Sequence, residues 1–276
     1  MKMNLSIVAS LNEVKRSKEE INEGFQSLCE FLKPLGYNGI ELSLLKPEKI
    51  DVGSLKELME SYEMQVPALG TGGTYIRYGY SLGSEDRSKR MLAIGRLKEY
   101  INLAAEINSK VIIGLIRGRY NYQSNPKKEK LNIIDSLKEC LRYAEGKDVN
   151  LVFEPINRFE IDSYTTISSS LYLLEKLNSD HIDLLIDSFH THLEEDPGFI
   201  WDQLRDIATH VGHIHLADSN RRSPGTDHFD FRAFINIFKQ SNYNGFYSLE
   251  TIMEPSFEEV AKVGAEYLKF IDTIVK

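Results

Sequence analysis

Short apolar runs alternate with longer segments of helical periodicity along the whole chain. Each run is four to six residues long, which is typical of a buried parallel strand. The runs lie at residues 5–9, 39–42, 66–70, 110–115, 150–154, 183–187, 211–215 and 246–250. Between them, apolar residues recur with the 3.6-residue period of an amphipathic helix. The predicted helices lie at residues 19–35, 54–62, 86–107, 126–144, 167–177, 198–209, 230–240 and 257–274.

Eight strands that alternate with eight helices predict an α/β fold, the closed (β/α)8 or TIM barrel. The chain has 276 residues, and such a barrel takes about 250 in one domain. No linker or composition break divides the sequence, so we expect a single domain over residues 1–276. An open, doubly wound sheet is the alternative fold.

The longer predicted loops all follow the carboxyl ends of strands. They lie at residues 71–85, 117–125, 157–166, 188–197 and 217–228. Loops at the opposite strand ends, such as 36–38 and 108–109, are short. Barrel enzymes build their active sites from the loops at the carboxyl ends. We therefore expect any functional site at this face of the barrel.

Four consecutive predicted strands end on a side chain that binds metals: Glu154, Asp187, His215 and Glu250. The spacings are 33, 28 and 35 residues, and one βα unit takes roughly 30. The four side chains therefore occupy equivalent places on successive units and should converge above the barrel rim. Three carboxylates and one imidazole favour a single hard divalent ion, Mn²⁺ first and Mg²⁺ or Co²⁺ as alternatives.

Further polar residues follow the predicted ligands in sequence. Glu160, His190 and Arg221 lie so close to them that we expect a role in function. Arg117 and Arg119 follow the fourth strand. An arginine at a barrel rim is a suitable partner for a carboxylate or phosphate. A structural pairing with the acidic rim is the equally open alternative for these two arginines.

Other polar residues near the rim have simpler interpretations. His213 lies two residues before His215 and so points to the same side of its strand; we expect a hydrogen-bonded core histidine. For Arg158, Asp218 and Arg222, a role in the site and a role in capping loops are both open.

Charge and cysteine content restrict the partners and the cellular location. Lys and Arg number 33 and Asp and Glu 41, a net charge of −8. An acidic chain has no electrostatic attraction to nucleic acid or to anionic membranes. No window approaches 18 apolar residues, and the apolar stretch near residue 5 is short for a signal peptide. Cys29 and Cys140 lack partner motifs, so we expect reduced thiols and a cytoplasmic protein.

Several motifs in the second half resemble those of one enzyme family. They are FEPINRFE at 153–160, IDSFH at 186–190, GHIH at 212–215 and DSNR at 218–221. They resemble the ketose 3-epimerases of the xylose isomerase-like superfamily of sugar isomerases and epimerases. The strong motifs cover roughly residues 150–255, and the first half resembles the family in its βα rhythm and in GIEL at 39–42.

The resemblance implies roles for the residues singled out above. The ligands of one divalent ion would be Glu154, Asp187, His215 and Glu250. The substrate contacts would be Glu160, His190 and Arg221. The family often has Met-Glu-Pro at its last strand end, and here that tripeptide is at 253–255, so Glu254 is the alternative fourth ligand. A homodimer or homotetramer is also implied.

The implied reaction is epimerisation through proton abstraction next to a carbonyl. The ion would stabilise the enediolate, and Glu154 and Glu250 would be the catalytic pair that removes and returns the proton. The substrate would be a ketose or a keto-sugar acid. Arg117 and Arg119, with GTG at 70–72, resemble the keto-sugar-acid epimerases of the 5-keto-gluconate type. We therefore expect Arg117 or Arg119 to bind an acid group.

Three alternative functions remain open. A hydroxypyruvate or inosose isomerase of the same superfamily is the second enzyme alternative, and the tetrad EPIN at 154–157 also suits the former. A barrel that binds a metal or sugar without turnover is the non-catalytic alternative. A zinc nuclease like the type IV apurinic endonucleases is disfavoured, because no histidine precedes His181 and the net charge is −8.

Overall fold

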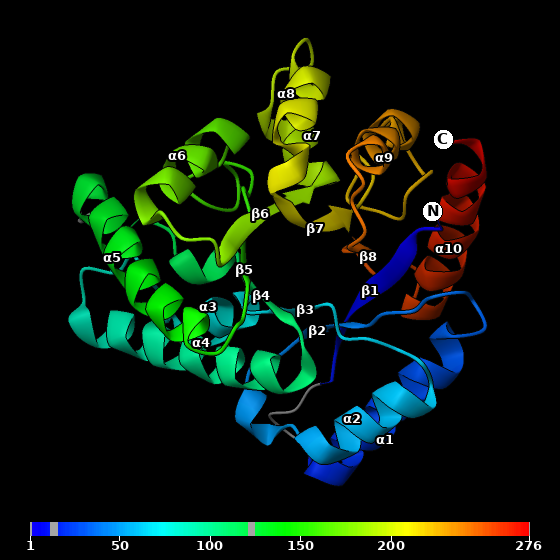
Figure 1. Ribbon diagram of the computed structural model, residues 1–276, viewed down its shortest axis with the longest axis horizontal. Helices are drawn as coiled ribbons and strands as arrows, with labels where there is room; N and C mark the ends of the chain where they lie inside the picture. Colours follow the sequence, from blue (N-terminus) through cyan, green and yellow to red (C-terminus); the bar gives the residue numbers. More distant parts are fainter. Residues whose placement is uncertain (1, 12–15, 121–124, 276) are drawn as a thin grey trace.

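The strands of the protein close into one parallel barrel in sequence order, β1 to β8. The computed structural model describes residues 2–11, 16–120 and 125–275. Helices surround the strands (Figure 1). The strands are β1 (Asn4–Ser10), β2 (Glu41–Ser43), β3 (Ala68–Gly70), β4 (Lys110–Ile113), β5 (Leu151–Phe153), β6 (Ile182–Asp187), β7 (Val211–Leu216) and β8 (Phe246–Leu249). The predicted TIM barrel is confirmed.

Ten α-helices and three 3₁₀ turns connect the strands within the described residues. The helices are α1 (Lys18–Leu32), α2 (Val52–Ser61), α3 (Gly72–Tyr78), α4 (Arg87–Ile107), α5 (Pro126–Glu145), α6 (Ile167–Leu177), α7 (Ser188–Glu194), α8 (Ile200–Ile207), α9 (Phe231–Gln240) and α10 (Phe257–Ile274). The 3₁₀ turns are η1 (Pro47–Lys49), η2 (Leu115–Arg117) and η3 (Ala208–His210).

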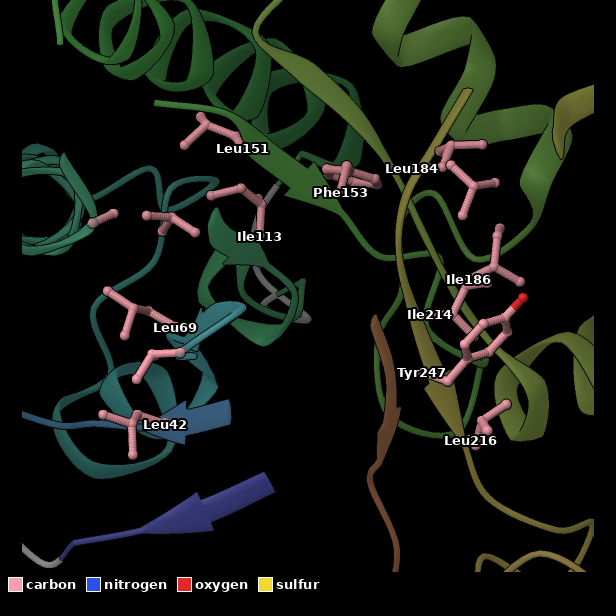
Figure 2. Close-up of a cluster of buried hydrophobic side chains, with 14 of the residues drawn as sticks. Leu42, Leu69, Ile113, Leu151, Phe153, Leu184, Ile186, Ile214, Leu216 and Tyr247 are labelled. Atoms are coloured by element: carbon pink, nitrogen blue, oxygen red, sulfur yellow. The ribbon is translucent and has the colours of Figure 1, made fainter. Parts of the chain in front are cut away.

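The outward faces of the strands form the main core. Figure 2 shows Leu151 and Phe153 of β5, with Leu184 and Ile186 of β6, among the buried side chains of this cluster. They belong to the same cluster as helix residues such as Leu137. Burial of each such side chain contributes about 1.5–3 kcal/mol. This layer holds the strand ends, and so the site, in fixed positions.

The interior of the barrel combines a small apolar cluster with polar residues. The cluster contains Ala68, Ile112, Val152 and Leu185. Because side chains two residues apart point to the same side of a strand, Glu154 follows Val152 inward, and Asp187 follows Leu185. The strand alternation thus directs the polar strand ends into the mouth of the barrel.

Two helices lie where long loops were predicted. The segment 188–197 was predicted as a loop, but α7 begins at Ser188 because the Asp187 carboxylate accepts the backbone N–H groups of Phe189 and His190. The segment 71–85 contains α3. This helix was not predicted because it begins with two glycines, which have low helix propensity. Residues 121–124 of the predicted loop 117–125 lie outside the described residues.

Both cysteines are free and buried, as predicted. Burial raises the pKa of Cys29 and of Cys140 to about 12, so neither thiol is reactive near neutral pH. No helix within the described residues has the length and apolar character needed to cross a membrane.

Candidate metal centre

The four predicted ligands converge at the carboxyl end of the barrel. Glu154 follows β5, Asp187 ends β6, His215 lies in β7 and Glu250 follows β8. The Nδ1 atom of His215 lies 3.5 Å from Glu154 Oε1, 3.9 Å from Asp187 Oδ2 and 3.4 Å from Glu250 Oε2. The first three side chains are buried, whereas that of Glu250 is 32% exposed. One nitrogen and three oxygens therefore surround a common point.

Two buried atoms at this point lack a hydrogen-bond partner among the described residues, Glu154 Oε1 and His215 Nδ1. An unpaired buried polar atom costs about 1–3 kcal/mol, so a further group is expected between them. Ligand atoms that share one ion at about 2.1 Å stand about 3–4 Å apart, as these do. The residues therefore fit a divalent cation, and their mainly oxygen character suits Mn²⁺ or Mg²⁺.

The two glutamates of the site differ in acidity. Burial raises the pKa of Glu154. Burial also acts to raise the pKa of Glu250, but His215 and Arg221 outweigh it and hold that pKa well below its usual range. Two carboxyl groups whose pKa values are driven apart can serve as acid and base in one reaction.

The surrounding carboxylates also act on His215. Burial alone would lower its pKa, but Glu41 and Glu250 raise it well above the usual value. A cation that binds at Nδ1 must therefore compete with a proton, and its affinity should fall as the pH falls.

Glu41 holds both histidines of β7 and was not predicted as a functional residue. Its Oε2 atom lies 2.8 Å from His213 Nε2 and 3.1 Å from His215 Nε2. A carboxylate only accepts, so each imidazole donates Nε2–H to Glu41. His215 Nδ1 is then the nitrogen that can bind a cation in place of its proton. The expectation that His213 is a hydrogen-bonded core histidine is confirmed.

Substitution of Glu41 is predicted to reduce stability in a pH-dependent way. Burial acts to raise the pKa of Glu41, but the two histidines outweigh it and lower the pKa to about 2. Glu41→Gln removes the negative charge that faces His213 and His215, and it should lower the free energy of unfolding by about 3 kcal/mol at pH 7. A carboxyl group whose pKa is lower in the folded than in the unfolded state stabilises the folded protein above its unfolded pKa of about 4.3. That stabilisation is lost as the pH falls toward the folded pKa.

Urea unfolding of wild type and Glu41→Gln between pH 7 and pH 3 measures this effect. The difference in unfolding free energy should be largest between about pH 4.3 and pH 6.5, the unfolded pKa values of glutamate and histidine, and should shrink below about pH 4.3. Glu57→Gln, on the exposed face of α2, is the control and should match wild type throughout. A difference that grows as the pH falls below about 4.3 would contradict the proposed charge state of Glu41.

The three predicted substrate contacts line a cavity of about 180 Å³ together with three of the predicted ligands, Glu154, His215 and Glu250. Arg221 donates from Nη1 to Asp187 at 3.0 Å and from Nη2 to Glu250 at 2.7 Å, with its guanidinium over the Phe189 ring. His190 Nε2 lies 3.8 Å from Glu154 Oε1. Glu160 also lines the cavity. The structure therefore brings these three residues together with the ligands.

Arg117 and Arg119 do not line this cavity. Arg117 is fully buried, donates to the carbonyls of Gly114 and Ser163, and lies over the Phe153 ring. Burial lowers its pKa to about 10. Arg119 pairs with Asp162 instead. The geometry gives no support to the expectation that either guanidinium binds an acid group of the substrate.

Glu254 lies outside the cluster. It pairs with Arg222 at 2.7 Å, and its side chain is 58% exposed. Of the two alternative fourth ligands, Glu250 is the one whose carboxylate faces His215 Nδ1.

The remaining polar residues near the rim order the loops. Asp218 accepts backbone N–H groups from Gly225 and Phe229 and so folds the loop between β7 and α9. Arg158 pairs with Glu194 at the surface. For these residues the contacts favour the structural interpretation over a role in the site.

Comparison with known proteins identifies the family. The profile of the xylose isomerase-like TIM barrel family matches residues 29–271. The L-ribulose 3-epimerase of Methylomonas sp. strain DH-1 is 26% identical over 217 residues, 76% of this chain and 72% of that protein. The 3-dehydro-D-guloside 4-epimerase of Escherichia coli K12 is 23% identical, over 83% of this chain and 86% of that protein.

A solved structure of L-ribulose 3-epimerase has the same fold, with a TM-score of 0.85 at 20% identity, and the match covers 99% of this chain and 95% of that chain. The family profile spans most of the barrel and includes all four predicted metal ligands. The chain therefore belongs to the xylose isomerase-like TIM barrel family.

Proposed function

We propose that the protein is a divalent-metal-dependent sugar epimerase that inverts a carbon next to the carbonyl of a ketose. The main support is the convergence of three carboxylate oxygens on the unpaired Nδ1 atom of His215 at the barrel mouth. The names of the relatives, a 3-epimerase of L-ribulose and a 4-epimerase of a keto-sugar, agree with this chemistry.

Glu154, Asp187, His215 and Glu250 would hold the cation. When bound, that cation supplies Lewis acidity toward the carbonyl oxygen of the sugar. Glu250, whose pKa is depressed, suits the base that removes the proton beside the carbonyl. Glu154, whose pKa burial raises, suits the acid that returns a proton on the opposite face. The two roles exchange in the reverse direction, because epimerisation is reversible.

The remaining cavity residues orient the sugar. His190 and Arg221 line the cavity, where they would face the sugar oxygens next to the reacting carbon and stabilise the negative charge of the enediolate. Glu160 can accept a hydrogen bond from a sugar hydroxyl. These contacts hold the reacting carbon between Glu154 and Glu250, which is the positional part of the catalysis.

The charge of the cavity favours a neutral ketose over a keto-sugar acid. Arg221 is the one lysine or arginine that lines the cavity in the described part of the chain. Both terminal nitrogens of Arg221 already bind Asp187 and Glu250. A carboxylate of a substrate would find no lysine or arginine that lacks an acidic partner, and it would face the four acidic side chains that line the cavity, Glu41, Glu154, Glu160 and Glu250. A neutral sugar avoids this desolvation and repulsion.

A substrate panel in D₂O tests the proposal. Neutral ketoses, keto-sugar acids, hydroxypyruvate and an inosose are incubated with the Mn²⁺-loaded protein, the ion is removed, and deuterium is measured by NMR. At least one neutral ketose should exchange its proton beside the carbonyl and form an epimer. Arg119→Ala, outside the cavity, should leave the preference for neutral over acidic sugars unchanged.

Two other outcomes of the panel would contradict this assignment. Exchange confined to hydroxypyruvate or to the inosose would favour the isomerase alternatives. Sugar binding without exchange from any compound would favour the non-catalytic barrel. The homodimer or homotetramer and the cytoplasmic location stay predictions from the sequence.

A further inference from the structure

We propose that Asn157 is a positioning residue that fixes His190 as the Nε2–H tautomer, so that this imidazole donates to a sugar oxygen and does not bind the cation. The inference rests on the proposed function for its catalytic consequence, but the tautomer itself follows from hydrogen bonds. Two histidines, His190 and His215, face the same carboxylates, and the structure gives them opposite partners.

The orientation of the Asn157 amide is determined by its neighbours. Its side chain is buried, and Oδ1 accepts the backbone N–H of Phe159 at 2.9 Å in an Asx turn. A backbone N–H only donates, so the oxygen of the amide must lie at this end. The opposite end is therefore the Nδ2 group, which donates to Glu160 Oε1 at 2.8 Å.

The second N–H of the same Nδ2 group meets His190. Asn157 Nδ2 lies 2.8 Å from His190 Nδ1. An amide NH₂ group has two donors and no acceptor, so Nδ1 must be the acceptor and carries no proton. A neutral imidazole then has its proton on Nε2. All the hydrogen-bonding groups of the Asn157 side chain are thereby used.

One contact competes with this assignment. Arg221 Nη1 lies 3.4 Å from His190 Nε2, and a guanidinium also only donates. That distance exceeds the usual range of about 2.7–3.2 Å, and Arg221 Nη1 has a better acceptor in Asp187 Oδ2 at 3.0 Å. The opposite tautomer would place two N–H groups against each other at 2.8 Å. The shorter contact decides the tautomer.

The two histidines consequently have different roles. His190 presents Nε2–H toward Glu154 Oε1 at 3.8 Å and Asp187 Oδ2 at 4.0 Å, and a protonated nitrogen cannot bind a metal. His215 donates Nε2–H to Glu41, so Nδ1 is its nitrogen that can bind the cation. The acceptor Glu41 leaves His215 as the metal ligand, whereas the donor Asn157 leaves His190 as a hydrogen-bond donor to the substrate.

NMR of the protein labelled with ¹⁵N-histidine measures the tautomer of His190 directly and does not require catalytic activity. The Mg²⁺-loaded protein is used, because Mg²⁺ is diamagnetic, and His190→Gln identifies the His190 signals by their loss. We expect Nδ1 in the range of an unprotonated imidazole nitrogen and Nε2 in the range of a protonated one. The reverse assignment, or a mixture of the two tautomers in wild type, would overturn the proposal.

Variants connect the tautomer with catalysis. Asn157→Asp replaces the donor by a carboxylate that only accepts, so the proton should move to Nδ1 and kcat should fall about 10²-fold with a smaller change in KM. Asn157→Ala should give mixed tautomers and an intermediate kcat. Asn102→Asp makes the same atomic change on the exposed face of α4 and should alter neither kcat nor the His190 signals.

The outcomes separate this proposal from the proposed function. A folded Asn157→Ala protein with the wild-type His190 signals and kcat would show a purely structural asparagine and would overturn the inference. If wild type has the Nε2–H tautomer but epimerises no sugar, the tautomer assignment is supported and the proposed function is contradicted.

Discussion

Replacement of Glu250 with glutamine is expected to lower kcat for epimerisation by about 10²- to 10⁴-fold. The amide keeps the size of the side chain but cannot take a proton from the carbon beside the carbonyl. It also removes one negative charge that faces His215 Nδ1 at 3.4 Å. Steady-state kinetics on the best ketose of the panel, with Mn²⁺ content measured on the same samples, separates loss of the base from loss of the ion.

Glu254→Gln is the matched control, four residues further along the chain. Its carboxylate pairs with Arg222 outside the cavity, and an exposed ion pair contributes about 0–1 kcal/mol to stability. We expect kcat and Mn²⁺ content equal to those of wild type. Loss of activity in Glu254→Gln, with activity retained in Glu250→Gln, would assign the fourth ligand to the other glutamate.

Removal of the divalent ion is expected to abolish turnover and to lower the melting temperature by several degrees. Without a cation, the repulsion among the three carboxylates is offset by the neighbouring side chains of His215 and Arg221 alone among the ligand set and its paired arginine. A ligand present at 100 times its Kd contributes about 2.7 kcal/mol of stability, and the thermal shift follows from that value. Dialysis against a chelator, followed by assay and calorimetry, measures both effects.

Restoration with graded Mn²⁺ at several pH values completes this test. Activity should return with one equivalent of ion per chain. The apparent affinity should fall as the pH is lowered, because the raised pKa of His215 makes a proton the competitor for Nδ1. Full turnover after exhaustive chelation, or an affinity that does not depend on pH, would contradict the proposed ligand set.

The barrel and the convergence of the four side chains at its mouth could be predicted because they follow from local patterns. Each βα unit has a similar length, and a closed parallel barrel brings equivalent strand ends to one rim. The positions of Glu154 and Asp187 then follow from the alternation of strand side chains. No long-range contact had to be known for this part of the site.

Residues whose role depends on long-range contacts could not be predicted. Glu41 bonds to His213 and His215, which are 172 and 174 residues away in sequence. A charged residue inside the apolar run at 39–42 was the available signal, but that signal does not identify its partner. The same holds for Asn157, whose contact with His190 spans 33 residues.

Arg117 shows the limit of inference from a position at the rim. It follows β4 at the carboxyl face, where a side chain can point into the cavity or into the barrel wall. The 3₁₀ turn η2 directs the Arg117 guanidinium onto Phe153 and onto backbone carbonyls. Sequence spacing cannot distinguish these two directions, because the turn changes the strand alternation at this point.

Anomalous scattering from a crystal grown with Mn²⁺ tests the proposed metal centre directly. One anomalous peak within about 2.5 Å of Glu154, Asp187, His215 Nδ1 and Glu250 is the predicted result. His190 should stand outside the coordination sphere, with its Nε2 atom directed at the substrate cavity. An absent peak, or a peak bound by His190 in place of His215, would contradict the metal centre on which the epimerase proposal depends.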